Sequence, residues 1–299
     1  MQNNPDQFSS KIGFVLAAAG SAVGIGNLVG FPVAAAKNGG GAFLLLYIFF
    51  VVAICLPLIL AELSMGRATG KSPLGAFREI SKGHKGWVLA GALSLITPFM
   101  IAVFYSVLTV WLLGYFLLVL FGQLDQLATP VYFGGFITSP WIFAYLAAVI
   151  AMVVFVLKGG VRDGIEKASR LLMPMLFIML IGLTAFVLTL PNASEGLKFY
   201  FTPQIDRITW NVVNGALSQA FFSLSLGMGI LITYGSYLRK QDNLVQSAKM
   251  LACTDTGVAL VAGLMTLPAI FAIYPNTNPS ELSDSSVGLI FSFFPNIFM

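Results

Sequence analysis

The sequence predicts an all-α integral membrane protein, formed as a single transmembrane domain over residues 1–299. Of these residues, 58% are hydrophobic and 9% are charged, whereas a soluble domain carries about a quarter charged residues. The apolar residues also come in runs of about 20 or more, the length that a helix needs to cross about 30 Å of hydrocarbon. Lipid offers no partner for backbone N–H and C=O groups, so spans of this length are helices.

Seven apolar segments are long enough to be predicted as spans. They cover residues 12–36, 42–66, 87–121, 138–157, 168–190, 211–237 and 245–274. The first is too long for the apolar region of a cleaved signal peptide, which is the alternative at that position. Residues 275–299 begin with a polar stretch, and we expect an extracellular or re-entrant segment there.

The distribution of basic residues predicts that the N-terminus is cytoplasmic, in a multi-pass protein of the cell membrane. With the N-terminus inside, the cytoplasmic loops and span ends hold 13 of the 16 Lys and Arg residues and the outer ones hold Lys37, Lys198 and Arg207. Cytoplasmic loops carry the excess of positive charge in membrane proteins. This bias disfavours a seven-helix receptor, whose N-terminus would lie outside.

Several other classes of function lack support in the sequence. No basic stripe is interleaved with exposed aromatic residues, so no nucleic-acid partner is expected. Cys55 and Cys253 fall inside predicted spans and are interpreted as packing residues. No Ser–His–Asp or Cys–His set converges, and His84 is the single histidine, so we do not expect an enzyme.

Two predicted spans contain residues that interrupt helices. The first holds Gly20, Gly24, Gly26 and Gly30 with Asn27, and the sixth holds Gly227 and Gly229 beside Ser223 and Ser225. Close helix packing through small residues is one explanation of the first cluster. Glycine clusters in two spans favour a second explanation, namely that both helices are unwound to form a binding site. Unwound backbone survives in a membrane only where it lines a cavity or binds something. Freed carbonyls suit a cation and helix N-termini suit a carboxylate.

At these residues the chain resembles the neurotransmitter:sodium symporter family. The resemblance rests on the segments 20–32, 38–43, 62–67, 158–160, 164–167 and 222–237, with Met173-Pro174, and it extends in order over nearly the whole chain. It implies a LeuT-type inverted-repeat helical bundle with discontinuous first and sixth spans. Relatives have about eleven or twelve spans in two repeats of five plus extras, so the second repeat is expected to be incomplete.

The resemblance implies sodium sites made of hard oxygen ligands. The first sodium would be held by the Ala22 carbonyl, Asn27, Ser223 and Asp255. Part of the second would be held by carbonyls near Gly20 and Val23, with its remaining ligands on an eighth span. Asp255 stands where many relatives have Asn, and an acid inside a span costs about 2.5–3.5 kcal/mol, which indicates a function. The alternative is an Asp near a helix end that reaches water.

Chloride-dependent relatives bind an anion beside the first sodium. Tyr47, Gln219 and Ser223 match that pocket, but Ala259 stands where a polar group would be needed, and Asp255 already supplies a negative charge. We therefore expect dependence on sodium and not on chloride.

For the substrate, the resemblance implies a small zwitterionic amino acid. Backbone N–H groups near Gly24 and Gly26, with Tyr105, would hold its carboxylate. Gly24 favours a zwitterion because amine-transporting relatives carry an acid there. The other lining residues would be Ala22, Ile101, Phe222, Ser223, Ser225 and Met228. Glu62 is interpreted as a brace for the broken sixth span or, equally, as an ordinary helix-end acid beside Arg67.

Two departures from the family concern the gates. Gly30 stands where many relatives have an Arg of the outer gate, and Pro5 and Phe8 occupy a segment where relatives often have an Arg and a Trp of the cytoplasmic gate. The expected function is sodium-dependent symport of an amino acid across the lipid bilayer. The alternatives are a truncated fragment that binds ligand and sodium without translocating them, and one half of a two-chain transporter. The sequence predicts neither the substrate's side chain nor the oligomeric state.

Overall fold

The computed structural model describes residues 11–127, 129–239, 241–275 and Phe291. Every regular element in this part of the chain is a helix. Helices occupy all seven ranges expected from the sequence, with ends within three residues of those expected, and two of the ranges contain breaks. The predicted segment 275–299 lies outside the described residues, apart from Pro275 and Phe291.

The first range contains α1 (Lys11–Ala22), a π-helical turn η1 (Gly26–Gly30) and α2 (Phe31–Lys37). The chain bends by 54° between Leu16–Ala22 and Gly26–Lys37. Pro32 lies in the first turn of α2, where its missing N–H costs no helical hydrogen bond. The α-helix therefore resumes directly after η1.

The next helices form two long helical segments joined by a short helix. Gly41–Thr69 comprises α3 (Gly41–Phe50), π-helical η2 (Val51–Cys55) and α4 (Leu56–Thr69). Gly70 ends α4 in the left-handed conformation, with φ 62°, which glycine adopts without strain. Then α5 (Pro73–Ile80) leads into α6 (Lys85–Leu120), the longest helix described.

The middle of the chain returns through α7 (Leu124–Leu127), α8 (Pro130–Ile137) and α9 (Trp141–Lys158). A π-helical segment η3 (Gly160–Glu166) then joins α9 to α10 (Lys167–Val187). The buried Glu166 forms an ion pair with Arg170 across one helical turn, with 2.6 Å between Oε1 and an arginine nitrogen. This pair joins η3 to the start of α10.

The last part begins with α11 (Ala193–Phe201) and the 3₁₀ turn η4 (Ile205–Arg207). The sixth range is divided into α12 (Trp210–Ser223) and α13 (Ile230–Ser236), and α14 (Leu244–Ile273) follows. Asn243 caps α14, its side chain accepting a hydrogen bond of 3.0 Å from the backbone N–H of Gln246.

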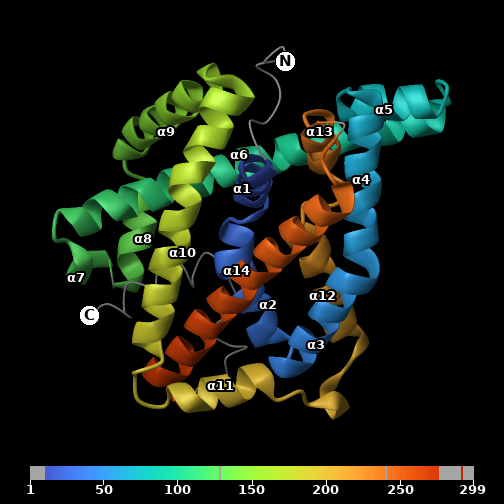
Figure 1. Cartoon of the computed structure of the whole chain (residues 1–299). Coiled ribbons are helices and arrows are strands. Elements are labelled where there is room, and N and C mark those ends of the chain that lie inside the picture. Colours follow the sequence, from blue (N-terminus) through green and yellow to red (C-terminus); the bar gives the residue numbers. More distant parts are fainter. Residues whose placement is uncertain (1–10, 128, 240, 276–290, 292–299) are drawn as a thin grey trace.

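The broken first range occupies the middle of the molecule. Figure 1 shows α1 and α2 behind the diagonal α14, with α10 on one side and α4 on the other. α13 lies against α4, where Gly66 meets the backbone carbonyl of Ile232 and Gly235 meets that of Leu63. These glycines leave no room for a Cβ, so the two helices touch through their backbones.

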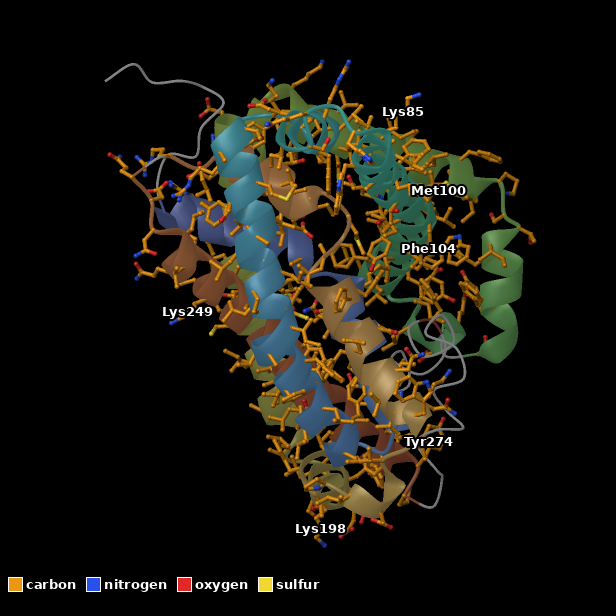
Figure 2. The ribbon with its side chains drawn as sticks, turned by 90° about the vertical axis from the view of Figure 1, so that its right-hand side faces the viewer. Lys85, Met100, Phe104, Lys198, Lys249 and Tyr274 are labelled. Carbon is orange, nitrogen blue, oxygen red and sulfur yellow. The ribbon has the colours of Figure 1, made fainter. Side chains whose placement is uncertain are left out.

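The outer surface is that of a multi-pass membrane protein. Five described helices are long and apolar enough to span a bilayer, or six if the bent pair around residue 24 counts as one span. α12 and α13 are each too short to span a bilayer on their own. Figure 2 shows the exposed Met100 and Phe104 of α6 on the flank of the molecule, between Lys85 at one end and Lys198 at the other.

Candidate functional site

Both expected breaks are present, and they differ in backbone geometry. In the first range, Val23–Ile25 separates α1 from η1. In the sixth, Leu224–Gly229 separates α12 from α13, with positive φ at Ser225 (55°), Gly227 (76°) and Gly229 (67°). The glycines adopt this conformation freely, whereas Ser225 is strained there. Backbone strain of this kind is often found at binding sites.

A buried polar cluster joins the two broken ranges to α14. The Asn27 amide nitrogen donates to Asp255 Oδ1 at 2.8 Å, to the Asp255 backbone carbonyl at 3.1 Å and to Ser223 Oγ at 3.0 Å. The Ser223 hydroxyl donates to Asp255 Oδ2 at 2.7 Å. The structure therefore brings together three of the residues expected to hold the first sodium, from three separate helical segments.

The Asp255 carboxylate is the electrostatic centre of this cluster. Its residue is fully buried, at 0% exposure, and no cationic side chain forms an ion pair with it among the described residues. A buried charge with only neutral donors is costly and calls for a positive partner. The Asn27 N–H groups lie against the oxygens that a cation would contact.

The remaining polar contacts hold the cluster to the first break. The Gly24 N–H donates to Asn27 Oδ1 at 3.3 Å, and Gln219 Nε2 donates to the Gly26 carbonyl at 3.0 Å. The Tyr47 hydroxyl is buried near the Ser223 and Thr256 hydroxyls without meeting hydrogen-bond geometry with either. Of the residues matched to the anion pocket, Gln219 is thus engaged with the unwound backbone.

A cavity of about 210 Å³ opens beside the cluster. It is smaller than the roughly 300–1,000 Å³ of pockets for drug-sized ligands. All nine residues that the resemblance implies for the substrate line it: Ala22, Gly24, Gly26, Ile101, Tyr105, Phe222, Ser223, Ser225 and Met228. The breaks and α6 therefore enclose one space with a polar end and an apolar wall.

Four further lining residues were not expected from the sequence: Ser21, Pro98, Ala102 and Ile230. Ser21 and Ala102 each lie next to an expected lining residue, Ala22 and Ile101, and Ile230 is the first residue of α13. Pro98 lies inside α6, about one turn before Ile101, and only helical spacing along this face would have indicated it.

The residues expected at the second sodium site lie at the end of α1 and the start of the break. Val23 is buried, and its N–H donates to the Ala19 carbonyl at 2.6 Å. Gly20 faces α10, where an added Cβ would be 3.1 Å from Ser169 Oγ. Their role as ligands stays a prediction.

Glu62 braces the broken sixth range, as one of the two interpretations of the sequence predicted. Its Oε1 accepts a hydrogen bond of 2.8 Å from the Gly227 backbone N–H. This N–H lies in the interruption between α12 and α13, so the carboxylate supplies the acceptor that the backbone of a continuous helix would supply. The neighbouring Arg67 instead donates to the Asp242 carbonyl at 2.7 Å.

A membrane bundle with two interrupted helices around a small cavity that has a polar end and an apolar wall is the architecture of a secondary transporter. The family model described as the sodium:neurotransmitter symporter family matches residues 5–131 and 124–299. The chain belongs to this family. Its members are secondary transporters and not enzymes, in agreement with the expectation from the sequence.

Individual relatives support the same assignment. The chain is 36% identical over 303 residues to YhdH of Bacillus subtilis, an uncharacterized sodium-dependent transporter, covering 99% of this chain and 65% of that protein. It is 27% identical to the sodium- and chloride-dependent GABA transporter ine of Drosophila melanogaster, over 96% of this chain and 35% of that protein. The chain thus spans less than two thirds of the length of both relatives.

Among solved structures, the chain is similar to MhsT crystallised in complex with L-phenylalanine. The TM-score is 0.86 at 40% sequence identity, over 98% of this chain and 66% of that one. This likeness confirms the predicted all-α, LeuT-type fold.

Proposed function

We propose that the protein acts in the sodium-dependent symport of a small zwitterionic amino acid. The observation that carries the proposal is the buried Asp255, whose side chain accepts hydrogen bonds from the neutral donors Asn27 and Ser223 and has no ion pair among the described residues. A sodium ion would balance its charge and use the hard oxygens nearby. Binding requires the Asn27 amide to turn, so that its oxygen faces the ion in place of its nitrogen.

The substrate class follows from the wall of the cavity. An acidic side chain at position 24 would repel a carboxylate, whereas Gly24 has open space within 4 Å of the position a Cβ would take. The Tyr105 hydroxyl lies 3.5 Å from the corresponding point at Gly26, within reach of a bound carboxylate. The complex of MhsT with L-phenylalanine supports an amino acid as ligand, and the flexible Met228 favours tolerance of several side chains.

Chloride independence is the finer part of the proposal. An anion near the sodium would lie close to the Asp255 carboxylate, and two negative charges in a buried site repel each other strongly. Ala259, buried on α14, offers no polar group to an anion.

The N-terminus is proposed to be cytoplasmic, because 13 of the 16 basic residues fall on that side.

Uptake by the purified chain in proteoliposomes tests the proposal. A mixture of radiolabelled amino acids is presented with an inward gradient of sodium or of choline, and with chloride or gluconate. We expect accumulation with sodium that is unchanged in gluconate. An equal loss in choline and in gluconate refutes chloride independence, and accumulation in choline refutes sodium coupling.

A matched pair of variants separates the site from general damage. Ser223→Ala removes the hydroxyl that contacts Asp255, whereas Ser218→Ala removes an exposed hydroxyl from the same helix. We expect uptake to fall only in the first. Sodium-dependent thermal stabilisation by an amino acid, without any accumulation, would favour the alternative of a protein that binds without translocating.

A further inference from the structure

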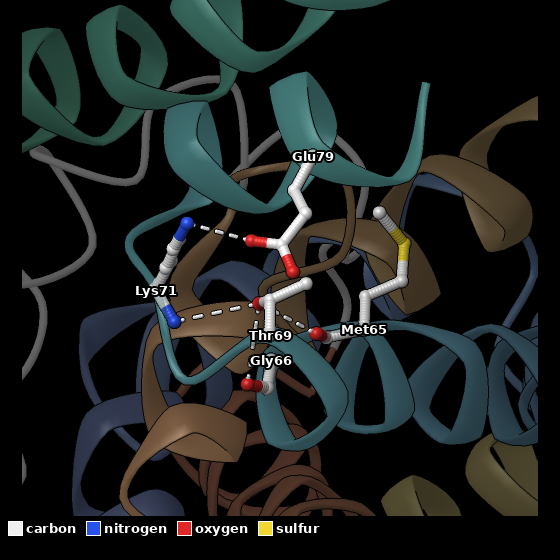
Figure 3. A network of polar contacts seen from close by, with 5 residues as sticks. All are labelled: Met65, Gly66, Thr69, Lys71 and Glu79. Atoms are coloured by element: carbon white, nitrogen blue, oxygen red, sulfur yellow. Dashed lines mark hydrogen bonds and ion pairs between the residues drawn. The ribbon is translucent and has the colours of Figure 1, made fainter. Parts of the chain in front are cut away.

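The connection between α4 and α6 carries an unusual concentration of positive charge. Residues 71–85 contain Lys71, Arg78, Lys82 and Lys85 against a single acid, Glu79. Lys71 is paired with that acid, with 2.7 Å between Nζ and Oε2 (Figure 3). Among the described residues, no ion pair engages the other three basic side chains, and all three are exposed.

This connection lies at the membrane surface. It joins Gly41–Thr69 to Lys85–Leu120, two of the helices long and apolar enough to cross a bilayer. At the end of α4 the Thr69 hydroxyl donates to the Met65 carbonyl at 2.9 Å and accepts from the Lys71 N–H at 3.4 Å (Figure 3). The chain therefore turns within a few residues of the end of the span, which would place α5 beside the lipid headgroups.

Exposed apolar side chains lie beside the charges. Ile80, Trp87 and Leu89 are 53%, 57% and 60% exposed. The Trp87 ring stacks on Phe77, with 6.2 Å between centroids and 11° between planes. Tryptophan is enriched at the level of lipid headgroups, and basic residues next to apolar ones are typical of interfacial helices.

The short helix is also firmly positioned. Added Cβ atoms would be 3.0 Å from Phe77 at Gly91 and 2.6 Å from Pro73 at Gly229. α5 therefore packs on the start of α6 and, at its own start, on the last residue of the break in the sixth range. Arg78 on α5 and Lys85 at the start of α6 are thus carried by two helices packed on each other, with Lys82 in the turn between them.

We propose that Arg78, Lys82 and Lys85, with the Phe77–Trp87 pair, form a binding surface for the headgroups of anionic phospholipids. The three unpaired cations match the negative charge of such headgroups, while Ile80 and Trp87 enter the boundary between headgroups and acyl chains. Each basic residue near a membrane surface raises the association of anionic lipid roughly fivefold. The surface, which we call the α5 lipid surface, does not depend on the transport activity proposed above.

Quenching of Trp87 fluorescence by brominated lipids tests this surface. The full chain is reconstituted in bilayers with equal fractions of brominated phosphatidylglycerol or brominated phosphatidylcholine. The Trp87 signal is the difference between the wild type and Trp87→Phe. We expect stronger quenching by the anionic lipid, and a preference that declines at high salt because exposed charges are screened.

The variant that tests the charges is Arg78→Gln, Lys82→Gln and Lys85→Gln together. We expect it to lose the preference, while Arg78→Lys alone keeps it. The matched control is Lys158→Gln with Lys249→Gln, two exposed basic residues elsewhere; Figure 2 shows Lys249 on the opposite flank from Lys85. Equal quenching by the two lipids in the wild type, or a preference that survives the triple substitution, overturns the proposal. A loss as large in the control also overturns it.

Discussion

Replacing Asp255 by Asn changes the charge of the buried cluster with almost no change in shape. The carboxylate accepts two short hydrogen bonds, at 2.8 Å from Asn27 and 2.7 Å from Ser223. Hydrogen bonds to a charged group contribute about 1.5–3 kcal/mol each. A single amide oxygen can keep one of them, so the substitution removes about one such bond together with the negative charge.

The effect on sodium affinity is larger than the effect on folding. At an effective dielectric constant of 20, two unit charges 4 Å apart attract by about 4 kcal/mol. Without sodium, however, the buried carboxylate also pays a desolvation penalty that Asn does not. We therefore expect Asp255→Asn to fold with nearly unchanged stability in choline and to bind sodium about 2–4 kcal/mol more weakly, which is roughly 30- to 700-fold.

Thermal unfolding of the purified chain against sodium concentration measures this shift. The midpoint of the sodium-dependent rise in Tm should move to higher concentration in Asp255→Asn by the factor above. Asp242→Asn is the matched control, since Asp242 lies outside the cluster and contacts Arg239. A sodium midpoint in Asp255→Asn that equals the wild-type value would refute the assignment of this carboxylate to the ion.

Three further predictions concern the frame of the site. Glu62→Ala leaves the exposed Gly227 N–H without its acceptor and should destabilise the chain by about 0.5–1.5 kcal/mol in thermal unfolding, whereas Glu62→Gln should cost less. Gly66→Ala places a methyl group against the backbone of α13 and should prevent a stable fold. Gly182→Ala, in open space within α10, should not lower Tm. Equal effects of the two substitutions on Tm would contradict the packing of α4 on α13. Burial raises the pKa of the Tyr200 hydroxyl, so above pH 10 the unfolded chain ionises first and wild-type stability should fall. Tyr200→Phe removes this residue's share of the effect and should show a shallower fall than the wild type in unfolding measured from pH 9 to 11.

The membrane class and the positions of the helices could be predicted from the sequence because both depend on local composition. The length of an apolar run determines whether a helix can cross lipid, and no distant contact changes that requirement. The π-helical segments η1, η2 and η3 were not predicted, because their hydrogen-bond register differs from that of an α-helix by one residue. Neither apolar periodicity nor propensity detects so small a difference.

Glycine indicated both breaks, although its physical role differs between them. In the sixth range Gly227 and Gly229 adopt positive φ, the conformation that glycine permits. In the first range Gly26 does not have a positive φ. A Cβ added at Gly26 would lie 3.1 Å from the Phe222 side chain and 3.5 Å from the Tyr105 hydroxyl, so the neighbouring side chains require a small residue there. At Gly26 a small residue is therefore needed beside two aromatic side chains, in a range where the helix is also interrupted. The number of glycines in the sequence cannot distinguish a need for positive φ from a lack of space for a Cβ, because glycine satisfies both requirements.

The cluster of Asn27, Ser223 and Asp255 shows where reasoning from local sequence ends. Asn27 and Asp255 are 228 positions apart and share a hydrogen bond of 2.8 Å. No periodicity connects them, so their proximity was expected only from the family resemblance. Local reasoning does explain why each residue is costly alone: an acid, an amide and a hydroxyl in apolar helices all lack partners in lipid. The cost is met when the two breaks and α14 fold against each other, so the same polar groups that could bind an ion also hold the interrupted helices in register. A variant that weakens sodium binding by removing one of them should therefore also loosen the contact between η1 and α14, and hydrogen exchange at the amides of residues 24–30 should rise in Ser223→Ala but not in Ser218→Ala.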